Sequence, residues 1–168
     1  ECLTAQLREM GARVTEFDDS IRVEADRRLR RSNVKTMPYP GFPTDMQPQI
    51  AVCMALAEGT SLVTEGIYDN RFRYTAELNR MGASIQVESK TAVIDGVTQL
   101  HGCEVRACDL RAGAAMVIAA LCAEGTTTIE DAHYIERGYE DIIGKFAAIG
   151  GKIRRIETFE GNSQDAAG

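Results

Sequence analysis

The sequence predicts an α/β domain with internal pseudo-symmetry, in which apolar helices lie inside and β-sheets lie outside. Three observations lead to this prediction. One helix–glycine–strand plan occurs three times, a second segment occurs twice, and two helical segments are apolar almost all round. Because repeats of this kind bury their apolar faces against one another, we expect three such units to pack their inner helices into a common core.

The first repeated plan is an amphipathic helix that ends at a glycine and is followed by a strand. Its copies are LTAQLREMGARVTEFDDSIRVEA (3–25), YTAELNRMGASIQVESKTAVIDG (74–96) and DIIGKFAAIGGKIRRIE (141–157). Gly11, Gly82 and Gly150 stand where a helix needs a left-handed C-terminal residue, a conformation that costs glycine least. After the second glycine, alternating residues at 84–87 and 91–94 predict two paired strands with one buried face.

The second repeated segment occurs as AEGTSLVTEGIYDNRF (57–72) and AEGTTTIEDAHYIERGY (123–139), which align without gaps as far as an arginine. Each copy follows a run of small apolar residues, PQIAVCMALA (48–57) or RAGAAMVIAALCA (111–123). Helices that are apolar nearly all round belong inside a domain. The repeating unit is therefore buried helix, strand, surface helix, strand, strand, with a partial copy at the N-terminus.

The composition is that of a soluble globular protein with one domain. The chain has 168 residues, of which 44% are hydrophobic and 26% are charged. No apolar stretch is long enough to cross a bilayer, and the net charge of -6 argues against a general nucleic-acid surface. We therefore expect neither a membrane nor a nucleic acid as partner.

The cysteines and histidines indicate neither a disulfide framework nor a zinc site. The chain has five cysteines, an odd number and widely spaced, and only two histidines. We interpret the cysteines as reduced thiols in a cytosolic protein, and we expect no metal and no cofactor. Because the chain opens on Glu1, without an initiator methionine, in what reads as the middle of a helix, we also expect it to be a fragment of a longer protein.

An aspartate stands at the start of each apolar helix. An Asp before a helical run is a common N-cap, which accepts backbone N–H bonds, and this is the simpler interpretation of Asp109. Asp45 lies in YPGFPTDMQPQ (39–49), where prolines fix the backbone in front of it. Capping does not require that rigidity, so for Asp45 a cap and a deliberately held functional carboxylate stay open.

Three arginines are candidates for binding an anion. Arg111 lies in the first turn of a helix, where the macrodipole makes a cation unfavourable. Phosphate or carboxylate would compensate, and so would an ion pair with Asp109 or another acid. Arg71 and Arg137 occupy equivalent places in the two copies of the second segment. They either brace the same loop or face a shared anionic ligand.

The motifs PYPGFPTDMQPQ, YDNRF, LNRMGA, CDLRAGAAMVIAAL, AEGTT and IERGYEDI, in this order, closely resemble the UDP-N-acetylglucosamine enolpyruvyl transferase family. The resemblance runs to about Glu157 and makes 1–157 part of the family's C-terminal domain. It implies the EPSP synthase-like fold, described as an inside-out α/β barrel with buried helices and outer sheets. Residues 158–168 read as a flexible tail.

The resemblance also implies an activity: transfer of the enolpyruvyl group of phosphoenolpyruvate to the 3-hydroxyl of UDP-N-acetylglucosamine in bacterial peptidoglycan synthesis. Two alternatives stay open. One is the relative that acts on shikimate 3-phosphate, although the motifs NRF and RGYE fit the sugar-nucleotide enzyme better. The other is a noncatalytic sugar-nucleotide-binding module, although the presence of Asp45, Arg111 and Arg137 together favours catalytic ancestry.

Site residues follow from the motifs. The resemblance implies that Asp45 binds the sugar 3-hydroxyl and takes its proton, and that the backbone of Ile67 contacts the sugar nucleotide. It also implies that Arg111 and Arg137 hold phosphoenolpyruvate. A proline-braced loop suits such a base, because a base must lie within hydrogen-bond reach of the proton that it removes.

The resemblance further implies that Arg71 lies in the same cleft and that Asp109 orients its neighbours. The family's proton donor, usually a cysteine on a mobile loop, and its phosphoenolpyruvate-binding lysine belong to sequence that is not present here. None of the five cysteines matches that loop motif. We therefore expect the chain to need its missing N-terminal domain as partner, and to be inactive alone.

Overall fold

The computed structural model describes residues 1–157, so the tail expected at 158–168 lies outside the described residues. The N-terminal part contains α1 (Cys2–Glu9), β1 (Arg13–Glu16), β2 (Ile21–Glu24), β3 (Asn33–Lys35) and the 3-10 helix η1 (Thr44–Met46). The middle contains α2 (Gln47–Leu56), β4 (Thr60–Thr64), the 3-10 helix η2 (Arg71–Arg73), α3 (Tyr74–Arg80), β5 (Ser84–Glu88) and β6 (Thr91–Asp95). The last part contains β7 (Glu104–Arg106), α4 (Leu110–Cys122), β8 (Thr128–Glu130), α5 (His133–Glu136) and α6 (Ile142–Ala148).

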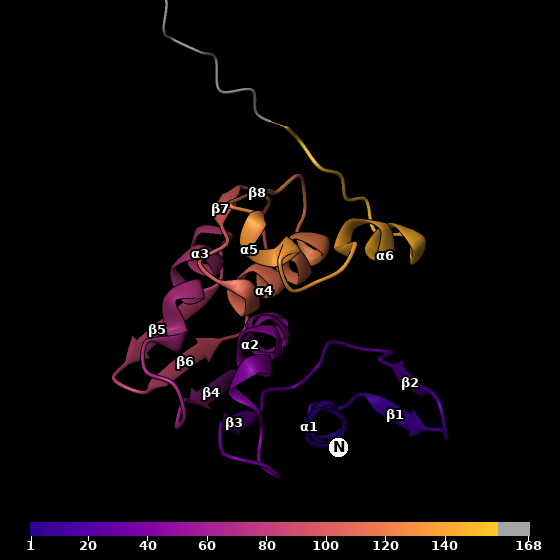
Figure 1. Ribbon diagram of the computed structural model, residues 1–168. Helices are drawn as coiled ribbons and strands as arrows, with labels where there is room; N and C mark the ends of the chain where they lie inside the picture. The colour runs from indigo at the N-terminus through magenta and orange to yellow at the C-terminus, as the bar shows by residue number, and fades with distance from the viewer. Residues whose placement is uncertain (158–168) are drawn as a thin grey trace, which may run out of the picture.

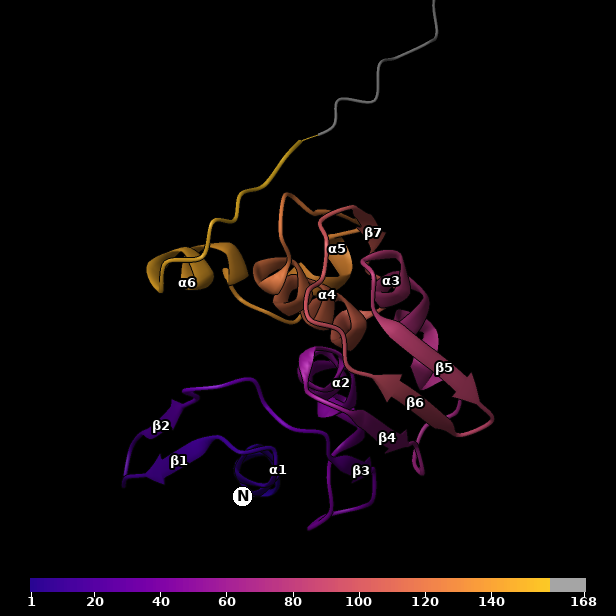
Figure 2. The same cartoon turned by 180° about the vertical axis from the view of Figure 1, so that it is seen from behind.

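Two apolar helices, α2 and α4, form the centre of the molecule and pack on each other, as Figures 1 and 2 show. Most buried residues of α4 are alanine or glycine, whereas α2 also buries larger side chains such as Ile50 and Met54. Fully buried side chains of this core include Ala51, Met54, Ala115 and Met116. The prediction of buried inner helices is therefore confirmed for both segments.

The sheets lie outside the two inner helices. The largest has the strand order β3-β4-β6-β5, with β3 and β4 parallel and the other pairs antiparallel. Val63 of β4 pairs with Val34 and with Ala92, and all three side chains are buried toward the helices. A parallel pair, β7 and β8, and the hairpin of β1 and β2 complete the described strands.

The glycines end their helices as predicted. Gly11, Gly82 and Gly150 have φ values of +99°, +95° and +95°, in the left-handed region that favours glycine. The strand expected after Gly150 is absent, because residues 151–157 pair with no other strand in the described part of the chain. A strand needs a hydrogen-bonded neighbour, and Ile156 is 62% exposed instead.

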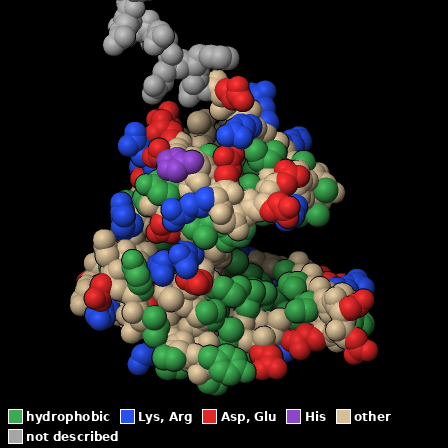
Figure 3. All heavy atoms as spheres, viewed as in Figure 1, with side chains coloured by type: hydrophobic (Ala, Val, Ile, Leu, Met, Phe, Trp, Pro, Cys, Tyr) green, Lys and Arg blue, Asp and Glu red, His purple; other side chains and the backbone are tan. Residues whose placement is uncertain are grey.

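The sequence predicted a common core of three inner helices. Within residues 1–157, the structure contains two inner helices, α2 and α4. The N-terminal partial copy supplies α1 and the β1–β2 hairpin, which lie apart from α6 in both ribbon views. A groove of about 700 Å³ runs along α4 and α6, lined mainly by Ala114, Ile118, Ile142, Phe146 and Ile149. Figure 3 shows a hollow with hydrophobic side chains on this face.

Two further expectations concern the cysteines and the membrane. All five cysteines are free thiols, as predicted. Among the helices of residues 1–157, none is both long and apolar enough to span a membrane.

Candidate active site

The loop before Asp45 is closed by its own backbone. The Met37 N–H donates to the Phe42 carbonyl at 3.0 Å, and the Gly41 N–H donates to the Pro38 carbonyl at 2.9 Å. Phe42, with 7% of its surface exposed, anchors the loop to the core. The stiff approach that the prolines predicted is therefore completed by hydrogen bonds and by one buried aromatic ring.

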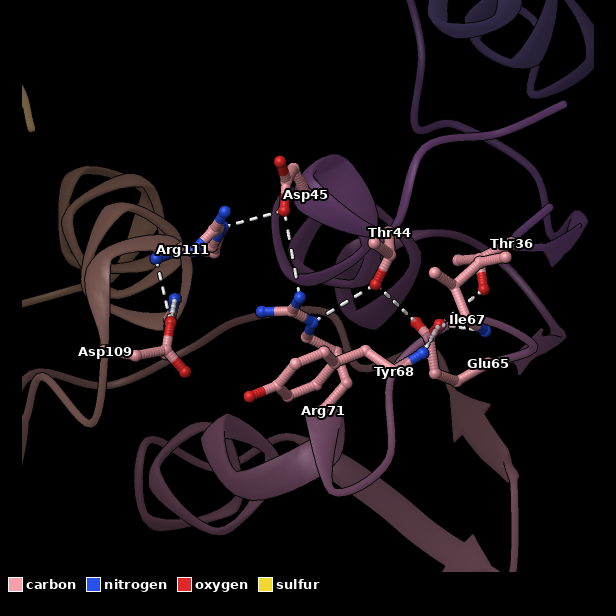
Figure 4. A network of polar contacts seen from close by, with 10 residues as sticks. Thr36, Thr44, Asp45, Glu65, Ile67, Tyr68, Arg71, Asp109 and Arg111 are labelled. Atoms are coloured by element: carbon pink, nitrogen blue, oxygen red, sulfur yellow. Dashed lines mark hydrogen bonds and ion pairs between the residues drawn. The ribbon is translucent and has the colours of Figure 1, made fainter. Parts of the chain in front are cut away.

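Asp45 does not cap α2. It lies inside η1, and its Oδ1 accepts a hydrogen bond of 2.8 Å from Nε of Arg111 on α4. The same oxygen lies 3.7 Å from a terminal nitrogen of Arg71 (Figure 4). The side chain of Asp45 is 57% exposed. Of the two interpretations left open for Asp45, the geometry favours a carboxylate held between two guanidinium groups over an N-cap.

Asp109 is the N-cap of α4. Its Oδ1 accepts hydrogen bonds of 2.9 Å from the backbone N–H groups of Arg111 and Ala112, and its own backbone is extended. The cap fixes the backbone of Arg111 directly. Because Asp109 already accepts from two N–H groups of this helix start, those two groups are not available to an external anion.

Arg111 forms the ion pair that was one of its two predicted roles, although its partner is Asp45 rather than Asp109. The hydrogen bond to Asp45 raises the pKa of the Arg111 guanidinium above its usual value. Its side chain is 36% exposed. Since a guanidinium has five N–H donors, the contact through Nε leaves four that can bind another anion.

Arg71 and Arg137 share one local arrangement and differ in burial. The guanidinium carbon of Arg71 lies 4.4 Å from the centre of the Tyr68 ring, and that of Arg137 lies 5.6 Å from the centre of the Tyr134 ring. Arg71 is buried, with 7% exposed, and its Nε donates to Thr44 Oγ1 at 3.2 Å. Arg71 therefore braces the site from inside.

Arg137 is exposed at the end of α5, and no hydrogen bond or ion pair joins it to Asp45 or Arg111 within residues 1–157. Its segment nevertheless lies beside the start of α4. A Cβ added at Gly138 would come within 2.7 Å of the Leu110 side chain. The structure thus brings Asp45, Arg71, Asp109 and Arg111 together, and Arg137 lies outside this set of contacts, next to Gly138 beside the start of α4.

Sequence reasoning missed a buried carboxylate, Glu65, that lies behind these residues. Glu65 is 4% exposed and accepts hydrogen bonds from Thr36, Thr44, Ile67 and Tyr68 (Figure 4). One signal was available, since Glu65 aligns with Asp131 in the second copy of the repeat. In both copies an acidic residue stands three residues before the aligned tyrosine, Tyr68 or Tyr134. Asp131 differs from Glu65 in being exposed.

Within residues 1–157, no group of three or more His, Cys, Asp or Glu side chains is placed to hold a metal ion. The charged groups of the site are arginines and carboxylates. Such a site can bind an anion and can accept a proton at Asp45.

A family model described as EPSP synthase (3-phosphoshikimate 1-carboxyvinyltransferase) matches residues 1–146. The chain belongs to the EPSP synthase family. Two relatives are the UDP-N-acetylglucosamine 1-carboxyvinyltransferases of Caldanaerobacter subterraneus, 54% identical over 156 residues, and of Clostridium perfringens, 49% identical over 160 residues. These matches cover 93% and 92% of this chain, which spans 37% of each relative's length.

Two solved structures share the fold of this chain. The enolpyruvyl transferase NikO from Streptomyces tendae has a TM-score of 0.85 at 32% identity, over 91% of this chain and 36% of NikO. The EPSP synthase of Acinetobacter baumannii has a TM-score of 0.54 at 17% identity, over 74% of this chain and 30% of its own. The predicted fold, an α/β domain of the inside-out barrel type, is therefore confirmed.

Proposed function

We propose that this chain forms one wall of the active site of a UDP-N-acetylglucosamine 1-carboxyvinyltransferase. The enzyme would move the enolpyruvyl group of phosphoenolpyruvate onto the sugar 3-hydroxyl, in cytoplasmic peptidoglycan synthesis, and so serve cell wall biogenesis, cell shape and cell division. The observation that carries the proposal is the exposed Asp45 carboxylate held between Arg111 and Arg71. The names and identities of the relatives favour the sugar nucleotide over shikimate 3-phosphate as acceptor.

In the proposed reaction, Asp45 is the general base. Its side chain is 57% exposed, so a substrate hydroxyl can reach it. The hydroxyl proton passes to Asp45 as the sugar oxygen bonds to the carbon that carries the phosphate, while the double bond takes up a proton at its methylene carbon from the proton donor expected in the remaining sequence. A methyl proton then returns to that donor, the double bond re-forms, and the bond from carbon to the phosphate oxygen breaks. Asp45 passes its proton to the departing phosphate or to water. A base acts only within hydrogen-bond reach of its proton, which explains why the loop before Asp45 is closed and anchored.

Arg111 would bind the phosphate or carboxylate of phosphoenolpyruvate, with Arg137 joining from beside the start of α4 and Arg71 behind. An arriving anion competes with Asp45 for the Arg111 guanidinium and leaves the carboxylate freer to accept a proton. Ile67 would contact the sugar nucleotide through its carbonyl oxygen, because its N–H already donates to Glu65. Asp109 would keep Arg111 in place through the backbone of α4.

The test joins residues 1–157 to the remainder of the Caldanaerobacter relative, in place of its matching segment, and follows phosphate release from phosphoenolpyruvate. We expect release that requires UDP-N-acetylglucosamine and that falls at least about a hundredfold in Asp45→Asn, the scale on which general bases contribute. Asp19→Asn, an exposed turn residue, is the matched control.

Three other outcomes would contradict parts of the proposal. Release that requires shikimate 3-phosphate would identify the chain with the shikimate relative. No release with either acceptor would favour a binding module. Turnover by the 168-residue chain alone would contradict the expectation that the activity needs a further domain as partner.

A further inference from the structure

Glu65 follows β4, and its carboxylate is enclosed by donors. Oε1 accepts hydrogen bonds from the Thr36 hydroxyl at 2.7 Å and from the backbone N–H groups of Ile67 and Tyr68 at 2.9 and 3.0 Å. Oε2 accepts from the Thr44 hydroxyl at 3.0 Å. These partners come from the end of β3, from η1 and from the loop before η2. A single buried side chain therefore ties three segments together.

The direction of these hydrogen bonds is fixed. The Thr36 hydroxyl oxygen accepts from the Gly66 N–H at 2.8 Å, and the Thr44 hydroxyl oxygen accepts from Nε of Arg71 at 3.2 Å. Because a hydroxyl has one proton, each threonine uses that proton to donate to Glu65. A directed chain thus runs from the Arg71 guanidinium through Thr44 to Glu65.

The fold of the repeated unit does not need a buried acid at this place. In the second copy, Asp131 holds the equivalent position and is exposed, while the chain still turns from β8 into α5. A buried charge is weak evidence for stability, since well-packed apolar groups often serve as well. The burial of Glu65 therefore relates to what distinguishes the first copy, in which Arg71 is buried and donates to Thr44, whereas the equivalent Arg137 is exposed.

We infer that Glu65 is a positioning residue for the base of the proposed reaction, and the inference rests on that proposed function. Through Thr44 it holds the residue that precedes Asp45, and through Thr44 and Arg71 it orients a guanidinium beside the Asp45 carboxylate. Through its contact with Ile67 it also holds the loop expected to meet the sugar nucleotide. Glu65 acts through these residues and is not itself expected to touch substrate.

The two threonines offer a matched comparison in the chimaera described above. Thr36 and Thr44 each donate one hydrogen bond to Glu65 and accept one from another N–H group. Valine in place of either removes two hydrogen bonds and keeps the shape, so both variants should lose similar thermal stability. Only Thr44 contacts Arg71. Thr44→Ser keeps the hydroxyl and should restore the original behaviour.

We expect kcat at saturating substrates to fall about tenfold in Thr44→Val, or about 1.4 kcal/mol of transition-state stabilisation, and less than about threefold in Thr36→Val. Glu65→Gln should resemble Thr44→Val, because an amide offers one accepting oxygen where the carboxylate has two. Asp131→Asn makes the same chemical change at the equivalent exposed position and should leave kcat unchanged. Melting temperatures measured alongside separate stability from rate.

An active chimaera in which Thr44→Val and Thr36→Val have the same kcat would overturn the inference and leave the proposed function intact. Unchanged kcat in Glu65→Gln would do the same. A chimaera that releases no phosphate with either acceptor would overturn the proposed function and this inference with it. If Glu65→Gln fails to fold, the two threonine variants still decide the question.

Discussion

Replacing Arg71 by methionine should destabilise the 168-residue chain by about 3 kcal/mol, by the magnitudes usual for its contacts. Arg71 is 7% exposed, donates to Thr44 at 3.2 Å and stacks on the Tyr68 ring at 4.4 Å. Methionine is unbranched and apolar, so it fills the space of the arginine stem and removes only the guanidinium. The perturbation therefore isolates the polar contacts of this side chain.

The magnitude follows from these contacts taken one by one. A hydrogen bond from a charged donor contributes about 1.5–3 kcal/mol, and a desolvated cation over an aromatic face contributes about 1–2 kcal/mol. The ion pair with Asp45 adds at most about 0.5 kcal/mol, because it is 3.7 Å long and the Asp45 side chain is 57% exposed. The hydrogen bond to Thr44 and the ring contact therefore dominate.

Arg137→Met is the matched control, because it removes the same stacked group from an exposed place. Its guanidinium lies 5.6 Å from the Tyr134 ring centre, and its loss should cost less than about 0.5 kcal/mol. Urea unfolding followed by circular dichroism would compare the unfolding free energies of the two variants. In thermal unfolding, the melting temperature of the Arg71 variant should lie about 6–12 °C below that of the unsubstituted chain. Equal midpoints for the two variants would refute the view that Arg71 is an internal brace.

Three further predictions concern the rest of the fold. Asp109→Ala should cost about 1 kcal/mol in urea unfolding and Asp109→Asn a few tenths, because asparagine still caps α4; equal losses would contradict capping. Gly96→Ala should cost about 3 kcal/mol or prevent folding, because the added Cβ would lie 1.6 Å from the Ala57 carbonyl oxygen, and a wild-type melting curve would exclude this overlap. Burial raises the pKa of the Cys53 thiol, so it should react with iodoacetamide more slowly in the folded than in the unfolded chain at about pH 8.5, the usual thiol pKa. Its contribution to stability is full below the unfolded-state pKa and is lost as pH rises through the folded-state pKa; equal alkylation rates would contradict the burial of Cys53.

The parts of the fold that depend on local pattern were predictable. The apolar runs at 48–57 and 111–123 became α2 and α4, and the alternation around 84–94 became the β5–β6 hairpin. The helix-ending glycines followed from the same kind of argument, since each requires a left-handed backbone. The strand expected after Gly150 failed because periodicity describes one segment, whereas a strand also needs a partner.

The site residues that belong to a sequence motif, such as Asp45 and Arg111, were predictable. The contacts between segments that lie far apart in the sequence were not. In the sequence, Glu65 is a polar residue that follows a predicted strand, and no neighbouring residue indicates that its side chain is buried. Its enclosure depends on Thr36 and Thr44, which precede it by 29 and 21 residues. The partner of Arg111 was likewise ambiguous, because Asp109 is near in sequence and Asp45, 66 residues away, is near in space.

An aspartate lies near the start of each inner helix, and the two aspartates have different uses. At α4 the chain arrives extended, and Asp109 turns its carboxylate back onto the helix N–H groups. At α2 the chain arrives through η1, with Asp45 inside the 3-10 turn and Pro48 near the helix start, where a missing N–H costs little. The backbone of α2 therefore begins without help from the Asp45 side chain. A carboxylate released from capping can face Arg111 and solvent, as the role of general base proposed for Asp45 requires.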